Sequence, residues 1–124
     1  MSNPKTVLVA DDEPMLRRLV LATIRGLPLR VLEAATGPDA LAVARQELPD
    51  LMLLDVGLPD MDGFAVCRSL KADPATAGIK VVMLTARAQR QDLARGVEAG
   101  ADAYITKPFS PQRLLSDLTG FLQD

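Results

Sequence analysis

The sequence predicts an α/β fold in which a parallel sheet is covered by helices on both faces. Short, almost uninterrupted apolar runs recur along the chain, as expected for strands buried on both faces of a parallel sheet. They alternate with segments whose apolar residues recur at helical spacing, which is typical of repeated strand–helix units. One run, Leu-Met-Leu-Leu at residues 51–54, ends directly on an acid, Asp55, and turn residues follow at Gly57 and Pro59. Such a charge lies at the carboxyl end of a strand, where open α/β sheets bind their ligands.

Length and composition fit one soluble domain. The chain has 124 residues, 48% of them apolar, and a formal net charge of −2. We therefore expect a single domain over residues 1–124 with no effector domain in this chain. The net charge gives no reason to expect binding to nucleic acid. No apolar run approaches the roughly 18 residues of a membrane span, and the N-terminus lacks the pattern of a secretory signal, so we expect a cytoplasmic protein.

The chain contains no histidine and a single cysteine, Cys67. The absence of histidine excludes a Ser-His-Asp triad, a Cys-His pair and a histidine-ligated zinc site. Cys67 cannot form an internal disulfide, which fits a reducing compartment, and its apolar neighbours predict a small buried side chain. Chemistry in this chain must therefore rest on carboxylates, hydroxyls and lysine.

The first half of the chain is expected to form two strands and two helices before the run at residues 51–54. Residues 6–10 form the first strand, and Asp11-Asp12-Glu13 follow it directly. Pro14 suits the first turn of the next helix, where its missing N–H costs nothing. Residues 30–34 are the second strand, and residues 39–45 lie in the second helix. The apolar stripe of the first helix comprises Leu16, Leu19, Val20, Ile24 and Leu27, and it stops near Gly26.

The second half continues the alternation. The expected elements are strands at 51–54, 80–84 and 102–105, helices at 63–72 and 89–98, and a last helix carrying Leu114, Leu115, Leu118 and Phe121. Asp62 and Ser110 can cap the helices that follow them, and Gly100 is a natural left-handed stop. Thr85 follows the fourth strand and Lys107 follows the fifth. Polar residues thus recur where strands end.

Periodicity alone does not determine the order of the strands. Right-handed crossovers leave a few topologies, and in the flavodoxin-like order 2-1-3-4-5 the first and third strands are neighbours at the switch point. Asp11, Asp12 and Asp55 would then converge, and Thr85 and Lys107 would arrive from the fourth and fifth strands. Because polar residues accumulate at the ends of these four strands, we predict a flavodoxin-like (βα)5 doubly wound parallel sheet.

Three carboxylates in one crevice repel one another. A pair about 4 Å apart costs on the order of 4 kcal/mol at an effective dielectric near 20, and either protonation or a cation relieves this. An all-oxygen ligand set favours a hard cation such as Mg²⁺. Lys107 and Thr85 suit the negative charge of a phosphoryl group, and a carboxylate can be the nucleophile that accepts it. These residues predict metal-assisted phosphorylation of an aspartate.

Four motifs follow one another along the chain: Asp11-Asp12-Glu13, Leu54-Asp55-x-x-Leu58-Pro59-x-Met61-Asp62-Gly63, Leu84-Thr85-Ala86 and Gly100-Ala101-Asp102-x-Tyr104-x-x-Lys107-Pro108-Phe109. Through these motifs, the sequence from residue 7 to about residue 122 resembles the CheY-like receiver domains of two-component response regulators. Each motif is weak alone, but their order and spacing together are specific.

The resemblance implies that Asp55 accepts a phosphoryl group from a phosphohistidine on a sensor histidine kinase or a histidine phosphotransfer protein. It implies that Asp11, Asp12 and Asp55 hold Mg²⁺ together with the backbone carbonyl of Gly57. Among these, Asp12 is expected to be a direct ligand, whereas Asp11 acts largely through water.

The resemblance also assigns residues around the acceptor. Thr85 and Lys107 are expected to hold the phosphoryl oxygens, and Tyr104 to turn inward as an aromatic switch when Thr85 moves. We further expect Arg87 to pair with the phosphoryl group and Pro108 to follow a cis peptide bond.

As a receiver, the chain would be a signalling switch that catalyses only its own phosphorylation and dephosphorylation. Its output would pass to a downstream protein or to an effector domain outside this chain. A homodimer through the fourth helix, fifth strand and last helix is left open.

Three other functions fit the sequence less well. A phosphohydrolase of the haloacid-dehalogenase type also uses a nucleophilic Asp, but it requires a second Asp two residues later, where this chain has Gly57. A flavodoxin-like cofactor binder would want a Gly-, Ser- or Thr-rich loop after the first strand instead of three acids. A phosphorylation-independent docking module would not need the filled site positions.

Overall fold

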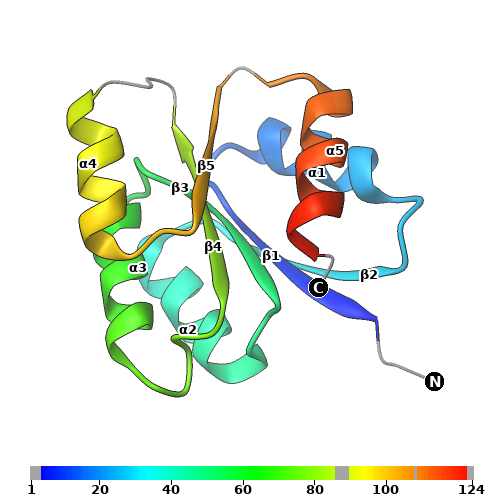
Figure 1. The fold of residues 1–124 in the computed structure, drawn as a ribbon. Coiled ribbons are helices and arrows are strands. Elements are labelled where there is room, and N and C mark those ends of the chain that lie inside the picture. The colour runs from blue at the N-terminus through cyan, green and yellow to red at the C-terminus, as the bar shows by residue number, and fades with distance from the viewer. Residues whose placement is uncertain (1–3, 86–89, 108, 123–124) are drawn as a thin grey trace.

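The computed structural model describes residues 4–85, 90–107 and 109–122, in which five strands alternate with five helices (Figure 1). The strands are β1 (Lys5–Ala10), β2 (Leu29–Ala34), β3 (Leu51–Asp55), β4 (Lys80–Thr85) and β5 (Ala103–Thr106). The helices are α1 (Pro14–Ile24), α2 (Gly37–Glu47), α3 (Gly63–Ala72), α4 (Arg90–Ala99) and α5 (Pro111–Leu122). Every predicted element is present, with ends that differ by a few residues, and the predicted helix start at Gln89 lies outside the described residues.

The strands form one parallel sheet in the order β2-β1-β3-β4-β5, which confirms the predicted order. The register pairs Ala10 with Leu54, Asp55 with Leu84, and Thr85 with Thr106. Because all strands run in the same direction, the residues that follow β1, β3, β4 and β5 lie along one edge of the sheet. That edge carries Asp11, Asp12, Asp55, Thr85 and Lys107.

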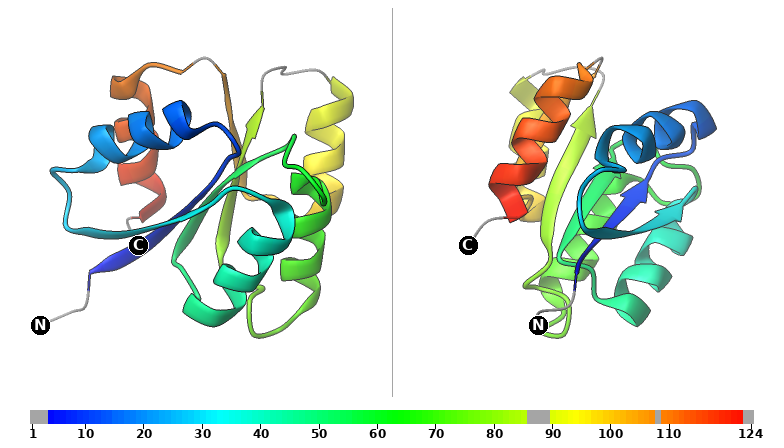
Figure 2. Two further views of the ribbon diagram at one scale, coloured as in Figure 1. Left: turned by 180° about the vertical axis from the view of Figure 1, so that it is seen from behind. Right: turned by 90° about the vertical axis from the view of Figure 1, so that its right-hand side faces the viewer.

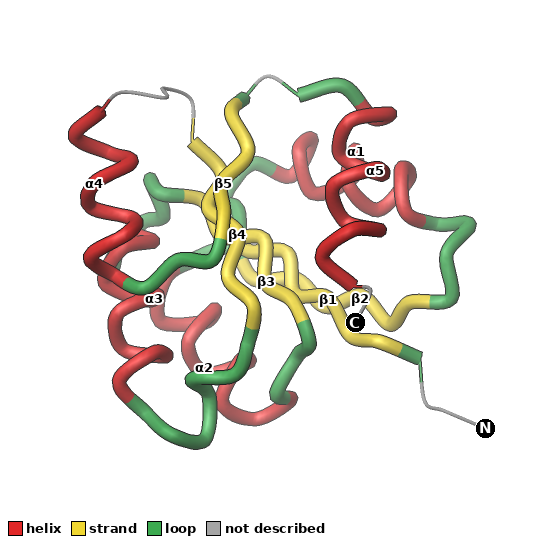
Figure 3. The backbone as a smooth tube through the Cα atoms, viewed as in Figure 1, coloured by secondary structure: helices red, strands yellow, loops and turns green. Residues whose placement is uncertain are grey.

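Helices cover both faces of the sheet, as Figures 2 and 3 show. Alternate strand residues contribute to two separate cores, because successive side chains of a strand point to opposite faces. One core joins the sheet to α1 and α5 through Val20, Ile24, Leu114 and Leu118. The other joins it to α2, α3 and α4. None of the helices in the described part of the chain has the length and apolar character needed to cross a membrane.

The apolar stripe of α1 is narrower than the sequence suggested. Val20 and Ile24 are buried, whereas Leu19 is 38% exposed, so its inclusion in the core stripe was wrong. Leu27 lies beyond the end of α1 but still packs against the core. A helix packed against a sheet buries side chains about four residues apart, as at Val20 and Ile24. Leu19 is next to Val20 in the sequence and therefore lies at the side of the helix, where it is exposed. Leu115 on α5 is exposed for the same reason.

The predicted helix ends are present. The Asp62 carboxylate accepts a hydrogen bond from the Ala65 N–H at 2.9 Å, which caps α3. The Ser110 hydroxyl oxygen accepts one from the Arg113 N–H at 3.1 Å, at the start of α5. Gly100 follows α4 with φ +93°, a left-handed conformation that glycine adopts without strain.

Cys67 is a structural side chain on α3. It is fully buried, and its thiol donates to the Ala99 carbonyl oxygen at 3.4 Å, which links α3 to the end of α4. Burial raises the pKa of the Cys67 thiol to about 11. The thiol is therefore protonated at neutral pH, and the prediction that Cys67 packs as a small buried hydrophobe is confirmed.

Candidate functional site: an acidic cluster at the carboxyl edge of the sheet

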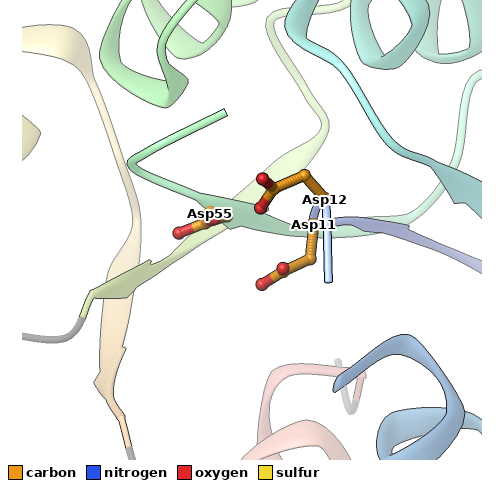
Figure 4. A group of neighbouring side chains, drawn as sticks. All are labelled: Asp11, Asp12 and Asp55. Atoms are coloured by element: carbon orange, nitrogen blue, oxygen red, sulfur yellow. The ribbon is translucent and has the colours of Figure 1, made fainter. Parts of the chain in front are cut away.

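Three carboxylates lie together at the carboxyl edge of the sheet. Asp11 and Asp12 follow β1, and Asp55 is the last residue of the adjacent strand β3. One oxygen atom from each side chain lies within 4.8 Å of the other two. Figure 4 shows the three side chains around a common space. The fold thus brings Asp55 next to two acids that lie at least 43 residues before it in the sequence, which requires that β1 and β3 be neighbours.

The three acids differ in burial and in hydrogen bonding. Asp11 is fully buried and accepts a hydrogen bond from the Glu13 N–H at 2.9 Å. Asp55 is 8% exposed and accepts one from the Gly57 N–H at 3.3 Å. Asp12, by contrast, is exposed to solvent. The cluster therefore has a buried floor and an open side from which a ligand can enter.

Lys107 supplies a positive charge between the two buried acids. Its Nζ lies 2.9 Å from Asp11 Oδ2 and 3.3 Å from Asp55 Oδ1. The backbone positions it, because the Lys107 N–H donates to the Thr85 carbonyl oxygen at 2.7 Å just beyond the paired ends of β4 and β5. With 16% of its side chain exposed, the lysine is largely shielded from water, so these ion pairs are screened much less than surface pairs.

The net charge of the cluster is negative even with Lys107 included. Burial and the charge of Asp11 raise the pKa of Asp55 above its ordinary value of 3.8, although Lys107 and the Gly57 N–H act in the opposite direction. Burial would lower the pKa of Lys107, but its hydrogen bond to Asp11 and the charges of Asp55 and Asp11 outweigh this and raise it. When all three acids are ionised, one lysine leaves an excess of two negative charges, which equals the charge of one divalent cation.

The raised pKa of Asp55 predicts that Asp55→Asn stabilises the metal-free protein at neutral pH. Between pH 3.8 and the raised pKa, the folded state holds a proton that the unfolded state has lost, so wild-type stability falls as pH rises through this interval. The Asn variant avoids that loss, and we expect a gain on the order of 1 kcal/mol in urea unfolding at neutral pH.

The pH dependence provides the control for this prediction. The gain should vanish below about pH 3, where the carboxyl group is protonated in both states. Equal stability of the two proteins at neutral pH in chelator would show that the buried charge of Asp55 carries no cost.

Thr85 lies at the carboxyl end of β4, and Tyr104 lies within β5. Thr85 ends β4 and is buried, one residue beyond the Leu84 that pairs with Asp55. Tyr104 pairs with Met83 in the register, and its side chain is 43% exposed. The ring of Tyr104 therefore lies at the surface in this structure.

The loop from residue 56 to residue 62, here called the acceptor loop, connects Asp55 to α3. Asp60 adopts φ +69°, which costs a non-glycine residue about 1 kcal/mol. Leu58 is buried, and the Gly63 N–H donates to the Val56 carbonyl oxygen at 2.9 Å. In the described part of the chain, no atom outside the adjoining residues lies within 4 Å of the place where a Cβ of Gly57 would be.

Sequence reasoning overlooked the close packing at two glycines. A Cβ on Gly63 would overlap the Asp55 carbonyl oxygen, and a Cβ on Gly37 would overlap that of Met61. The sequence pattern placed Gly63 at the start of a helix and in a family motif, and it assigned no packing role to Gly63 or Gly37. The available signal was a glycine within the first helical turn, where its low helix propensity requires another explanation.

Three predicted positions lie outside the described residues. These are Ala86 and Arg87 after β4, and Pro108 after Lys107. The pairing of Arg87 with a phosphoryl group and the cis bond before Pro108 therefore stay predictions.

Comparison with known sequences gives one consistent result. The family model for the response regulator receiver domain matches residues 7–119. The DNA-binding response regulator MtrA of Mycolicibacterium smegmatis is 42% identical over 110 residues, which cover 89% of this chain and 47% of MtrA. The response regulator PleD of Caulobacter vibrioides is 46% identical over 110 residues, covering 89% of this chain and 24% of PleD. The chain thus spans less than half the length of these relatives.

Solved structures with the same arrangement of elements include receivers of both regulators and kinases. The chemotaxis response regulator CheY4 of Vibrio cholerae superposes with a TM-score of 0.90 at 30% identity, covering 96% of this chain and 99% of CheY4. The receiver domain of the sensor histidine kinase PA1611 from Pseudomonas aeruginosa superposes with a TM-score of 0.86 at 29% identity, covering 95% of this chain and 97% of that one. The PA1611 structure is described with a magnesium ion coordinated in its active-site cleft.

Proposed function

Because the chain belongs to the response regulator receiver domains of two-component systems, we propose that Asp55 accepts a phosphoryl group from a phosphohistidine on a partner protein. In this step, a carboxylate oxygen of Asp55 forms the new P–O bond while the P–N bond to the donor imidazole breaks. The imidazole nitrogen keeps the electron pair of the broken bond. The observation that carries the proposal is the placement of Asp55 beside Lys107 and two further acids at one sheet edge.

A receiver domain is a signalling switch, so the covalent change serves to alter its conformation and its partners. The chain's own residues prepare Asp55 for the reaction. Burial beside Asp11 keeps its carboxylate poorly solvated, and Lys107 offers a cation 3.3 Å away that can move to an incoming phosphoryl oxygen. Among the described residues, none outside the adjoining ones comes within 4 Å of the Cβ position of Gly57, which leaves room there for the donor group.

Mg²⁺ is the cofactor that best fits the cluster. Asp11, Asp12, Asp55 and the backbone carbonyl of Gly57 would hold it, with Asp12 as a direct ligand and Asp11 acting largely through water. All the donors are oxygen atoms, as this ion prefers, and the excess of two negative charges matches its own charge. When bound, the ion would offset the repulsion between the acids and the phosphoryl oxygens.

We assign Thr85 and Lys107 to the phosphoryl oxygens and Tyr104 to the conformational switch. Thr85 is at the end of β4, and the Lys107 N–H donates to its carbonyl oxygen, so both residues lie at the edge of the sheet that carries the acids. A shift of Thr85 toward the phosphoryl group would open space into which the exposed ring of Tyr104 can turn. The phosphoryl group would thus select between two conformations of the domain.

The partners follow from this role. The donor would be a sensor histidine kinase or a histidine phosphotransfer protein in the cytoplasm, and the receiver of the signal a downstream protein or an effector domain outside this chain. Val97, Tyr104 and Leu115 expose apolar surface on α4, β5 and α5, where a second copy of the chain is one candidate partner. We propose no direct contact of this domain with nucleic acid or membrane.

The alternative functions are not favoured. A haloacid-dehalogenase-like phosphohydrolase requires a second acid two residues after the nucleophile, and this chain has Gly57 at that position. Sustained hydrolysis of a phosphate monoester would revive this alternative. A docking module that works without phosphorylation would not account for the buried carboxylates Asp11 and Asp55.

Intact-mass measurement tests the proposed function. With acetyl phosphate and Mg²⁺, we expect the chain to gain the mass of one phosphoryl group, because the ion offsets repulsion between the anionic donor and the acids. Chelation of Mg²⁺ should abolish the gain while the circular dichroism spectrum stays that of the folded protein. Labelling that is equally fast in chelator would contradict the role of the metal, and absence of labelling in both conditions would contradict the proposed function.

A further inference from the structure

We propose that Gly37, the first residue of α2, is a positioning residue that holds the acceptor loop at the distance from Asp11 and Asp12 that Mg²⁺ binding requires. This inference rests on the proposed function, because it assumes that the acidic cluster holds the ion. Gly37 belongs to neither of the acid-bearing segments. Its effect would pass through the backbone of the acceptor loop.

The contact between Gly37 and the loop is one of backbone on backbone. The Gly37 N–H donates to the Pro59 carbonyl oxygen at 3.1 Å. A Cβ at Gly37 would overlap the Met61 carbonyl oxygen and would lie 2.6 Å from the Met61 Cβ and 2.8 Å from its carbonyl carbon. Because most of these obstacles are backbone atoms, no change of rotamer can make room. Any larger residue must push the loop away from α2.

The acceptor loop needs such external support. Asp60, between the two residues that Gly37 touches, is held at φ +69°, and a strained conformation persists only where its surroundings determine it. At the other end of the loop, Gly63 lies against the Asp55 backbone, with the position of its Cβ 3.0 Å from both the Asp55 carbonyl carbon and the Val56 Cα. Because the loop is closely packed at this end as well, a displacement of Met61 would also shift Asp55 and Gly57.

The β2–α2 connection, residues 34–37, contacts both acid-bearing segments. At one end, the Ala34 carbonyl oxygen accepts a hydrogen bond from the Asp11 N–H at 3.0 Å. At the other end, Gly37 holds Pro59 and Met61. Between them, the Thr36 hydroxyl oxygen accepts from the Asp39 N–H at 3.2 Å and caps α2, which fixes where Gly37 lies. This short connection therefore sets the distance between the acids that follow β1 and the acceptor loop that follows β3.

Gly37→Ala should weaken Mg²⁺ binding in a chain that still folds. Since the added methyl group moves the Gly57 carbonyl and Asp55 relative to Asp11 and Asp12, we expect the Kd for Mg²⁺ to rise about tenfold, a typical effect of disturbing groups that orient metal ligands. Isothermal titration calorimetry with MgCl₂ measures this at a temperature where the variant is fully folded. A purely structural role would lower the melting temperature but leave the Kd of the folded protein unchanged.

Gly26→Ala is the matched control. Gly26 lies in the loop after α1, and its φ is outside the left-handed region. Apart from the adjoining residues, no described residue has an atom within 4 Å of its Cβ position. The same substitution should leave the Kd for Mg²⁺ as it is in the wild type. If the wild type binds Mg²⁺ and Gly37→Ala binds it equally well, the positioning role is wrong and the proposed function stands. If the wild type binds no Mg²⁺, both are wrong.

A measurement on the unaltered chain covers the case in which Gly37→Ala does not fold. Mg²⁺ should tighten the acceptor loop and slow hydrogen exchange of the Gly37 amide, whose acceptor is the Pro59 carbonyl oxygen. Exchange of the Gly26 amide should not change. An exchange rate at Gly37 that saturating Mg²⁺ leaves unaltered would overturn the proposal.

Discussion

Asp55→Asn should abolish phosphorylation by acetyl phosphate or by a phosphohistidine donor. The amide oxygen of asparagine is a far weaker nucleophile than a carboxylate, and the other buried acid of the cluster, Asp11, is already held by hydrogen bonds. Asp11 is fully buried and accepts hydrogen bonds from the Glu13 N–H and from Lys107. Intact-mass measurement after incubation with phosphodonor and Mg²⁺ should show only the unmodified variant.

Asp62→Asn is the matched control for this experiment. It removes the same charge from an exposed acid seven residues further along, and asparagine caps a helix as well as aspartate does. We expect it to be labelled like the wild type. Full labelling of Asp55→Asn would place the acceptor at another residue, whereas loss of labelling in both variants would point to a general effect on the fold.

Lys107→Met should destabilise the metal-free protein by about 3 kcal/mol at neutral pH, because removing one partner of a buried ion pair leaves the others uncompensated. Asp11 and Asp55 would then face each other with no cation between them. Methionine keeps most of the length of the lysine stem, so the loss reports mainly on the charge. Urea unfolding in chelator measures the difference, and saturating Mg²⁺ should remove much of it by restoring a positive charge.

The pH dependence of this difference has a definite sign. The pKa of Lys107 is raised above 10.5, so its contribution is fully present below about pH 10.5 and is lost as pH rises through the folded-state pKa. Lys5→Met, at an exposed lysine at the start of β1, should change stability by less than about 0.5 kcal/mol. If Lys107→Met is as stable as the wild type in chelator, the lysine is not compensating the buried acids.

Several features of the site follow from local sequence. The run at residues 51–54 requires a buried strand, and Asp55 directly after it must then stand at a strand's carboxyl end. The same reasoning places Asp11, Asp12 and Thr85, because in a parallel sheet all carboxyl ends share one edge. The caps at Asp62 and Ser110 were also predictable, since each depends only on residues within one helical turn.

Other features depend on contacts between distant segments, and only the tertiary structure decided them. Lys107 reaches Asp11 across 96 residues and Asp55 across 52, so its place between them follows from strand order, which no local pattern encodes. The exposure of Leu19 depends on how α1 lies on the sheet. The fit of Gly37 against Met61 likewise depends on where α2 begins relative to the acceptor loop. Local propensity and patterning thus determined the elements and the residues at their ends, whereas packing between elements determined which of those residues meet.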